Sequence, residues 1–119
     1  MALILVIDND ASVRTALCAL LLREGHEVLE AVNGVEGENL CAQNHPDLVI
    51  TDIFMPEKDG VETLLELRHD FPDIKVIVIS GNAQEFLPIT KDLGAHQTLT
   101  KPFKAVEVLK AVQELLEQI

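Results

Sequence analysis

The sequence opens with the stretch Leu3-Ile4-Leu5-Val6-Ile7-Asp8-Asn9-Asp10. Its first five residues form an unbroken apolar run rich in branched side chains, which is typical of a strand buried on both faces. The run stops abruptly at three polar residues that carry oxygen-bearing side chains. A strand of this kind belongs in a parallel sheet, and the carboxyl ends of its strands are where a ligand would bind.

Similar runs recur along the chain and alternate with segments whose apolar residues repeat at helical spacing. Further strands are predicted over residues 27–31, 48–50, 74–79 and 97–99, and helices over a segment ending at Gly25 and over 35–42, 61–67, 83–93 and 103–118. This order, strand then helix five times, predicts an α/β fold in which helices cover both faces of an open, doubly wound, five-stranded parallel sheet. A closed barrel of eight strands would need a much longer chain.

Length and composition narrow the class of protein. A chain of 119 residues predicts one domain over residues 1–119. A net charge of −11 disfavours nucleic acids and anionic membranes as partners. No apolar stretch approaches the roughly 18 residues of a membrane span, and no signal peptide opens the chain, so a cytoplasmic location is expected. Cys18 and Cys41 lie in apolar helical patterns and are predicted to be buried and reduced.

Polar residues follow four of the predicted strands. Asp8, Asn9 and Asp10 follow the first, and single polar residues follow the third, fourth and fifth, namely Asp52, Ser80 and Lys101. Carboxylate and amide oxygens suit a hard cation such as Mg²⁺. A hydroxyl and an ammonium group nearby would stabilise the negative charge of a phosphoryl group. The strand ends therefore predict phosphoryl chemistry.

The motifs that carry these residues resemble the receiver domain of response regulators in two-component signal transduction. They are Ile4-Leu5-Val6-Ile7-Asp8-Asn9-Asp10, Thr51-Asp52-Ile53-Phe54-Met55-Pro56 with Asp59-Gly60, Ser80-Gly81, and Lys101-Pro102-Phe103. Together they span nearly the whole chain. The resemblance implies a flavodoxin-like (βα)₅ fold with the strand order 2-1-3-4-5, and a signalling phosphoprotein rather than an enzyme with a separate substrate.

The resemblance also implies a role for each strand-end residue. Asp52 would be the phosphoacceptor, attacking a phosphohistidine or a small phosphodonor. Ser80 and Lys101 would contact the phosphoryl oxygens, and the Lys101–Pro102 peptide bond would be cis. The implied magnesium ligands are Asp8, Asn9, Asp52 and the backbone carbonyl of Phe54.

The implied partners are a histidine kinase or phosphotransfer protein that supplies the phosphoryl group and a downstream target protein. The target would bind the face formed by the fourth helix, the fifth strand and the fifth helix. Phosphorylation of Asp52 would add about −1.5 to −2 units of charge and shift the population of conformations at that face.

Two residues depart from the family pattern. Asn9 stands where a second carboxylate is usual, which predicts weaker magnesium affinity unless Asp10, otherwise a helix cap, partly compensates. Thr98 stands where the family usually has Tyr or Phe, so no aromatic ring can switch position there.

Two alternatives remain open. A receiver fold that is not phosphorylated could act only as a binding module. A phosphohydrolase similar to the haloacid dehalogenases could use Asp8 as nucleophile and Asp10 as general acid, which would leave Asp52 without a role.

Overall fold

The computed structural model describes residues 1–53, 60–81 and 90–118. Within them, five parallel strands form one sheet in the order β2-β1-β3-β4-β5. The strands are β1 (Leu3–Ile7), β2 (Glu27–Ala31), β3 (Leu48–Asp52), β4 (Lys75–Ser80) and β5 (Gln97–Thr100), and the helices are α1 (Ala11–Arg23), α2 (Gly34–Asn44), α3 (Gly60–Asp70) and α5 (Ala105–Leu116). The predicted fold class and strand order are confirmed.

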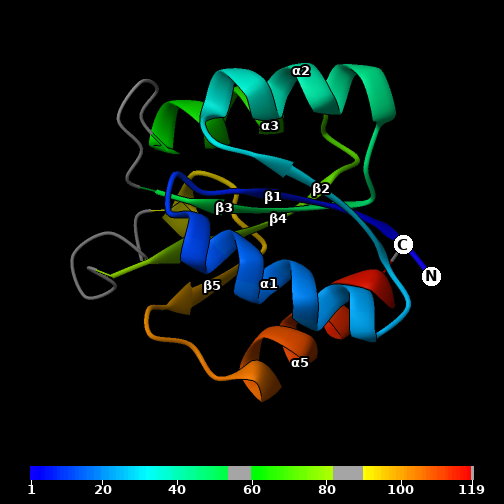
Figure 1. The fold of residues 1–119 in the computed structure, drawn as a ribbon. Helices are drawn as coiled ribbons and strands as arrows, with labels where there is room; N and C mark the ends of the chain where they lie inside the picture. Colours follow the sequence, from blue (N-terminus) through cyan, green and yellow to red (C-terminus); the bar gives the residue numbers. More distant parts are fainter. Residues whose placement is uncertain (54–59, 82–89, 119) are drawn as a thin grey trace.

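Helices cover both faces of the sheet, as a doubly wound fold requires (Figure 1). Helices α2 and α3 lie on one face, whereas α1 and α5 lie on the other. Most of the predicted helix over 83–93 lies outside the described residues; of the described part, residues 90–92 are helical and Leu93 is in a turn. In the described residues, no helix is long and apolar enough to cross a membrane.

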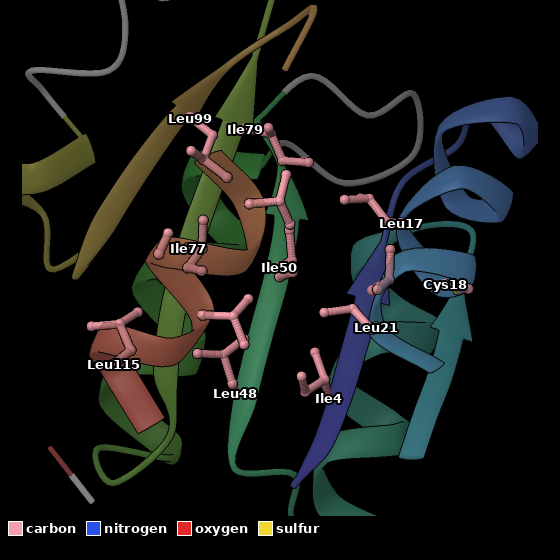
Figure 2. Packing of buried hydrophobic residues seen from close by; sticks show 14 residues of the cluster. Ile4, Leu17, Cys18, Leu21, Leu48, Ile50, Ile77, Ile79, Leu99 and Leu115 are labelled. Carbon is pink, nitrogen blue, oxygen red and sulfur yellow. The ribbon is translucent and has the colours of Figure 1, made fainter. Parts of the chain in front are cut away.

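The core is almost entirely aliphatic. On one face of the sheet, strand residues such as Ile4, Ile50 and Ile77 pack against Leu17 and Leu21 of α1 and against residues of α5 (Figure 2). A second cluster joins β1 and β3 to residues of α2 and α3 on the opposite face. Burial of this much apolar surface is the main source of stability for the domain.

Both cysteines are free thiols buried in the core, as predicted. Cys18 of α1 is 7% exposed and Cys41 of α2 is fully buried, so each packs against a different face of the sheet. Free cysteine in such a position acts as a small apolar side chain.

The ends of several elements differ slightly from the prediction. Strand β3 continues two residues past Ile50, because Thr51 pairs with both neighbouring strands and Asp52 pairs with Ile79. Helix α5 begins at Ala105 rather than at residue 103, because Lys104 is its N-cap and has extended backbone. Strand β4 ends at Ser80 rather than at residue 79. Asp52 and Ser80 are therefore the last residues of their strands instead of residues beyond them.

Gly60 fixes the start of α3 close to the end of β3. Its N–H donates to the carbonyl of Ile53 at 2.9 Å. A Cβ at this position would collide with the backbone of Ile53. The glycine of the Asp-Gly motif is therefore required by a close approach of two backbone segments just beyond the strand that carries Asp52.

Candidate functional site

The candidate site lies at the carboxyl edge of the three central strands. Asp8 directly follows β1 and is fully buried, while Asp52 ends the adjacent strand β3 and is 5% exposed. Ser80 ends β4, the next strand along, and is also fully buried. The parallel sheet thus brings together side chains that are up to 72 residues apart in the sequence.

Lys101 joins the two carboxylates. It follows β5, and its backbone N–H donates to the carbonyl of Ser80 at 2.9 Å. Its Nζ donates to Asp8 Oδ2 and to Asp52 Oδ2, each at 3.0 Å. The Lys101–Pro102 peptide bond is cis, as predicted. One ammonium group therefore contacts two buried carboxylates, which places the two carboxylates next to each other.

Burial and charge act against each other at this site. Burial raises the pKa of Asp8 above its ordinary value of 3.8, and the charge of Asp52 adds to this rise, although hydrogen bonds from Asp10 and Lys101 oppose it. Burial lowers the pKa of Lys101, but its hydrogen bonds to Asp8 and Asp52 and their charges outweigh this effect and raise it overall. The lysine stays protonated, whereas ionised Asp8 is held at an energetic cost.

Hydrogen bonds to the first loop, to α1 and to β2 hold Asp8 in place. The backbone N–H of Asp10 donates to Asp8 Oδ1 at 2.8 Å, and the backbone N–H of Asp8 donates to the carbonyl of Ala31 at 3.1 Å. Arg14 of α1 donates from Nη1 to the backbone carbonyl of Asp8 at 2.6 Å. The sequence reasoning missed Arg14. A signal was present, because Arg14 is the only charged residue between Ala11 and Leu22.

The remaining predicted residues have different settings. Asn9 is exposed beside the buried Asp8. Asp10 is the N-cap of α1, because its side chain accepts from the backbone N–H groups of Ser12 and Val13. Phe54, whose carbonyl was predicted as a magnesium ligand, lies outside the described residues.

The donor set fits an oxygen-preferring divalent cation. Two neighbouring carboxylates carry two negative charges, and the ammonium of Lys101 compensates only one of them. In the described part of the chain, His, Cys, Asp and Glu side chains form no cluster of three that could hold a metal. A magnesium ion here would therefore rely on Asp8 and Asp52 together with amide, carbonyl or water oxygens, which is the usual coordination of Mg²⁺ in proteins.

These features define a class of protein: a doubly wound α/β domain in which two buried carboxylates and an ammonium group are in contact at the strand ends. Comparison with known proteins gives the family. The family model for the response regulator receiver domain matches residues 4–113. The chain belongs to the response regulator receiver domain family, the phosphoacceptor modules of two-component signal transduction.

Individual relatives agree with this assignment. The chain is 35% identical to the chemotaxis protein CheY of Bacillus subtilis over 115 residues, covering 95% of this chain and 96% of CheY. It is 36% identical to the response regulator MprA of a Mycobacterium species over 116 residues, covering 97% of this chain but 50% of MprA. The chain thus spans about half the length of MprA and its two counterparts from other strains.

Solved structures show the same fold. The receiver domain of NtrX from Brucella abortus superposes with a TM-score of 0.94 at 29% identity, covering 98% of this chain and 99% of that domain. Members of this family are signalling modules that take phosphoryl groups from histidine kinases or phosphotransfer proteins, in general with the help of Mg²⁺.

Proposed function

We propose that residues 1–119 form one receiver domain whose phosphoacceptor is Asp52. The observation that carries the proposal is the pair of 3.0 Å contacts from Lys101 Nζ to Asp8 and Asp52. In the reaction, a carboxylate oxygen of Asp52 attacks the phosphorus of a phosphohistidine. The P–N bond breaks, its electron pair leaves with the imidazole nitrogen, and an aspartyl phosphate forms.

The neighbouring residues then have separate tasks. Lys101 donates hydrogen bonds to the phosphoryl oxygens, and Ser80, buried at the end of the next strand, supplies a hydroxyl to the same group. We assign the magnesium ligands to Asp8, Asn9, Asp52 and the backbone carbonyl of Phe54. When bound, Mg²⁺ would neutralise negative charge that develops during phosphoryl transfer.

Asn9 makes this site weaker than one with a third carboxylate. An amide oxygen can bind Mg²⁺ but brings no formal charge. Asp10 does not replace that charge at the site, since its side chain caps α1. We therefore expect a low magnesium affinity and slow phosphorylation compared with an Asn9→Asp variant.

The proposed partners are a histidine kinase or phosphotransfer protein on the input side and a target protein on the output side. The target would bind the face made by the fourth helix, β5 and α5, and the domain would act in the cytoplasm without binding nucleic acid. Thr98 of β5 has no ring, so the response to phosphorylation would travel through movement of the backbone. Mapping amide shifts with and without beryllofluoride tests this, and shifts confined to the site would contradict it.

The decisive experiment for Asp52 is mass spectrometry after treatment with acetyl phosphate and Mg²⁺. The wild type is expected to gain one PO₃ unit on Asp52, and Asp52→Asn none. The matched control is Asp73→Asn, the same substitution at an exposed position, which should be modified like the wild type. No incorporation at saturating Mg²⁺, even with a cognate kinase, would overturn the proposal and favour a pure binding module.

The same samples test for a phosphohydrolase. That alternative predicts multiple-turnover release of phosphate that depends on Asp10 and does not require Asp52. The role of Asp10 as the helix N-cap argues against it, because the carboxylate that would act as general acid already accepts hydrogen bonds from the helix backbone.

A further inference from the structure

Arg14 lies in the first turn of α1 and reaches back toward the end of β1. Its Nη1 donates to the backbone carbonyl of Asp8 at 2.6 Å, and its Nε lies 3.4 Å from Oε1 of Glu30 in β2. The side chain of Arg14 is 16% exposed and that of Glu30 is 53% exposed. Arg14 is thus a largely covered guanidinium group that connects a surface carboxylate to the backbone of a site residue.

The carbonyl of Asp8 needs such a donor because the sheet has ended there. The pairing of β1 with both neighbours stops at Ile7, which is opposite Ala31 on one side and Thr51 on the other. The backbone N–H of Asp8 still reaches Ala31. Its carbonyl lies beyond the last paired residues, and Arg14 supplies the hydrogen bond that a strand would otherwise supply.

Holding this carbonyl also fixes the residue that follows. The oxygen of Asp8 and the nitrogen of Asn9 belong to one planar peptide unit. Its orientation therefore sets the direction in which the chain leaves β1 toward Asn9 and Asp10. Asp10 in turn donates from its backbone to the Asp8 carboxylate. A shift of this peptide unit would move both the carboxylate of Asp8 and the side chain of Asn9.

We infer that Arg14 is a positioning residue that sets the cation affinity of the site by holding the Asp8–Asn9 peptide, and that Glu30 orients Arg14. The inference rests on the proposed function for the cation itself, whereas the positioning of the loop does not. The Arg14–Glu30 pair is partly exposed, so its own contribution to stability is small. The pair acts by fixing the orientation of the Asp8–Asn9 peptide.

Magnesium titration followed by amide shifts tests the inference. Arg14→Gln is expected to weaken Mg²⁺ binding by about ten-fold, the usual scale for a group that orients a ligand. Arg14→Lys, which keeps the charge but cannot span both partners equally well, should lie between this variant and the wild type. Glu30→Gln should have a smaller effect of the same sign. The control Arg23→Gln removes the same charge from an exposed position of the same helix and should match the wild type.

A second measurement needs no metal. Hydrogen exchange of the Asp10 amide reports on its hydrogen bond to Asp8, and this exchange should become several-fold faster in Arg14→Gln but not in Arg23→Gln. The rate of acetyl phosphate labelling, followed up to saturating Mg²⁺, completes the set. If Arg14 acts by positioning the cation ligands, Arg14→Gln should be labelled more slowly than the wild type at low Mg²⁺. It should regain most of this lost rate as Mg²⁺ is raised.

The possible results separate the two proposals. Reduced stability with unchanged magnesium affinity and unchanged Asp10 exchange would show that Arg14 is only structural and would overturn the inference. If the wild type neither binds Mg²⁺ nor takes up phosphate, the proposed function fails. The exchange rates of the Asp10 amide then decide alone whether Arg14 positions the Asp8–Asn9 peptide. If Arg14→Gln does not fold, Arg14→Lys and Glu30→Gln must show the intermediate effects, and wild-type behaviour in both would refute the inference.

Discussion

The middle of the sheet and its carboxyl edge both contain fully buried side chains, but these differ in chemistry. Ile50 in the middle of β3 and Asp8 at the end of β1 are both fully buried. Burying the isoleucine stabilises the fold, because apolar surface leaves water. Burying the carboxylate costs free energy, and its raised pKa reports that cost. The same strands thus provide stability in their middle and hold a cluster of charged side chains at their carboxyl ends.

The largest expected effect comes from the middle layer. Ile50→Ala should lower the free energy of unfolding by about 2–5 kcal/mol, because it removes buried methyl groups and leaves a cavity. Urea denaturation followed by circular dichroism measures this, since the chain has no Trp or Tyr. The control Val106→Ala, at a position 73% exposed, should change stability by no more than about 0.5 kcal/mol. Equal effects would mean that the core assignment is wrong.

Adding charge to the edge should have an intermediate effect. A unit charge about 4 Å away contributes about 1 kcal/mol even at full aqueous screening, so Asn9→Asp should tighten Mg²⁺ binding by about five-fold or more. Without magnesium, the added carboxylate should reduce stability, because it adds a negative charge next to the buried Asp8 in the chain. Titration calorimetry gives the affinity and urea denaturation gives the stability. An unchanged dissociation constant would exclude residue 9 from the cation site.

Removing charge from the edge should raise the stability of the metal-free protein. Asp8→Asn replaces the ionised group by a neutral one of the same shape, and the raised pKa of Asp8 means that the folded state disfavours the ionised form. The metal-free variant should therefore be more stable than the wild type near pH 7, and the difference should shrink as the pH falls and wild-type Asp8 becomes protonated. Urea denaturation without magnesium across this pH range provides the measurement. A less stable variant at pH 7 would show that the contact with Lys101 outweighs burial.

The amino end of the sheet provides the smallest effect. The Val76 N–H donates to Nδ1 of His96 at 3.1 Å, and burial together with the charges of Arg68 and Lys75 lowers the pKa of His96 below its ordinary value of 6.5. The unfolded chain therefore takes up this proton at a higher pH than the folded one, and stability should fall as the pH drops below about 6.5. His96→Asn keeps an acceptor and should remove this part of the pH dependence. An identical pH profile in both proteins would contradict the assignment.

Much of the fold was predictable because its signals are local. Leu3–Ile7 is apolar over its whole length, and the observed β1 has the same bounds. The end of β3 was not predictable in this way, because Thr51 and Asp52 are polar and join the strand only through pairing with their neighbours. Likewise, the start of α5 depends on Glu107, whose Oε1 accepts from the backbone of Lys104. Contacts of this kind are set by tertiary structure rather than by periodicity.

The site shows the same division. Asp8, Asp52, Ser80 and Lys101 were identifiable because each lies where an apolar run ends, and the structure brings the two carboxylates and the ammonium into contact. Arg14 was not identified, since its role depends on the direction of one side chain from α1 toward the end of β1. Sequence spacing reveals which residues share an edge of the sheet. A lone charge within α1, ahead of its last residue, distinguishes Arg14 from its neighbours, but it does not reveal that the side chain reaches over that edge.

The two buried cysteines have a practical consequence. Burial raises the pKa of the Cys18 thiol to about 11 and that of Cys41 to about 12. The thiolate is the form that reacts with alkylating reagents, so both native thiols should be nearly inert in the folded protein at neutral pH. A single cysteine introduced on the surface could then carry a fluorophore selectively, with the natural pair left in place, and would give this tryptophan-free domain an optical signal.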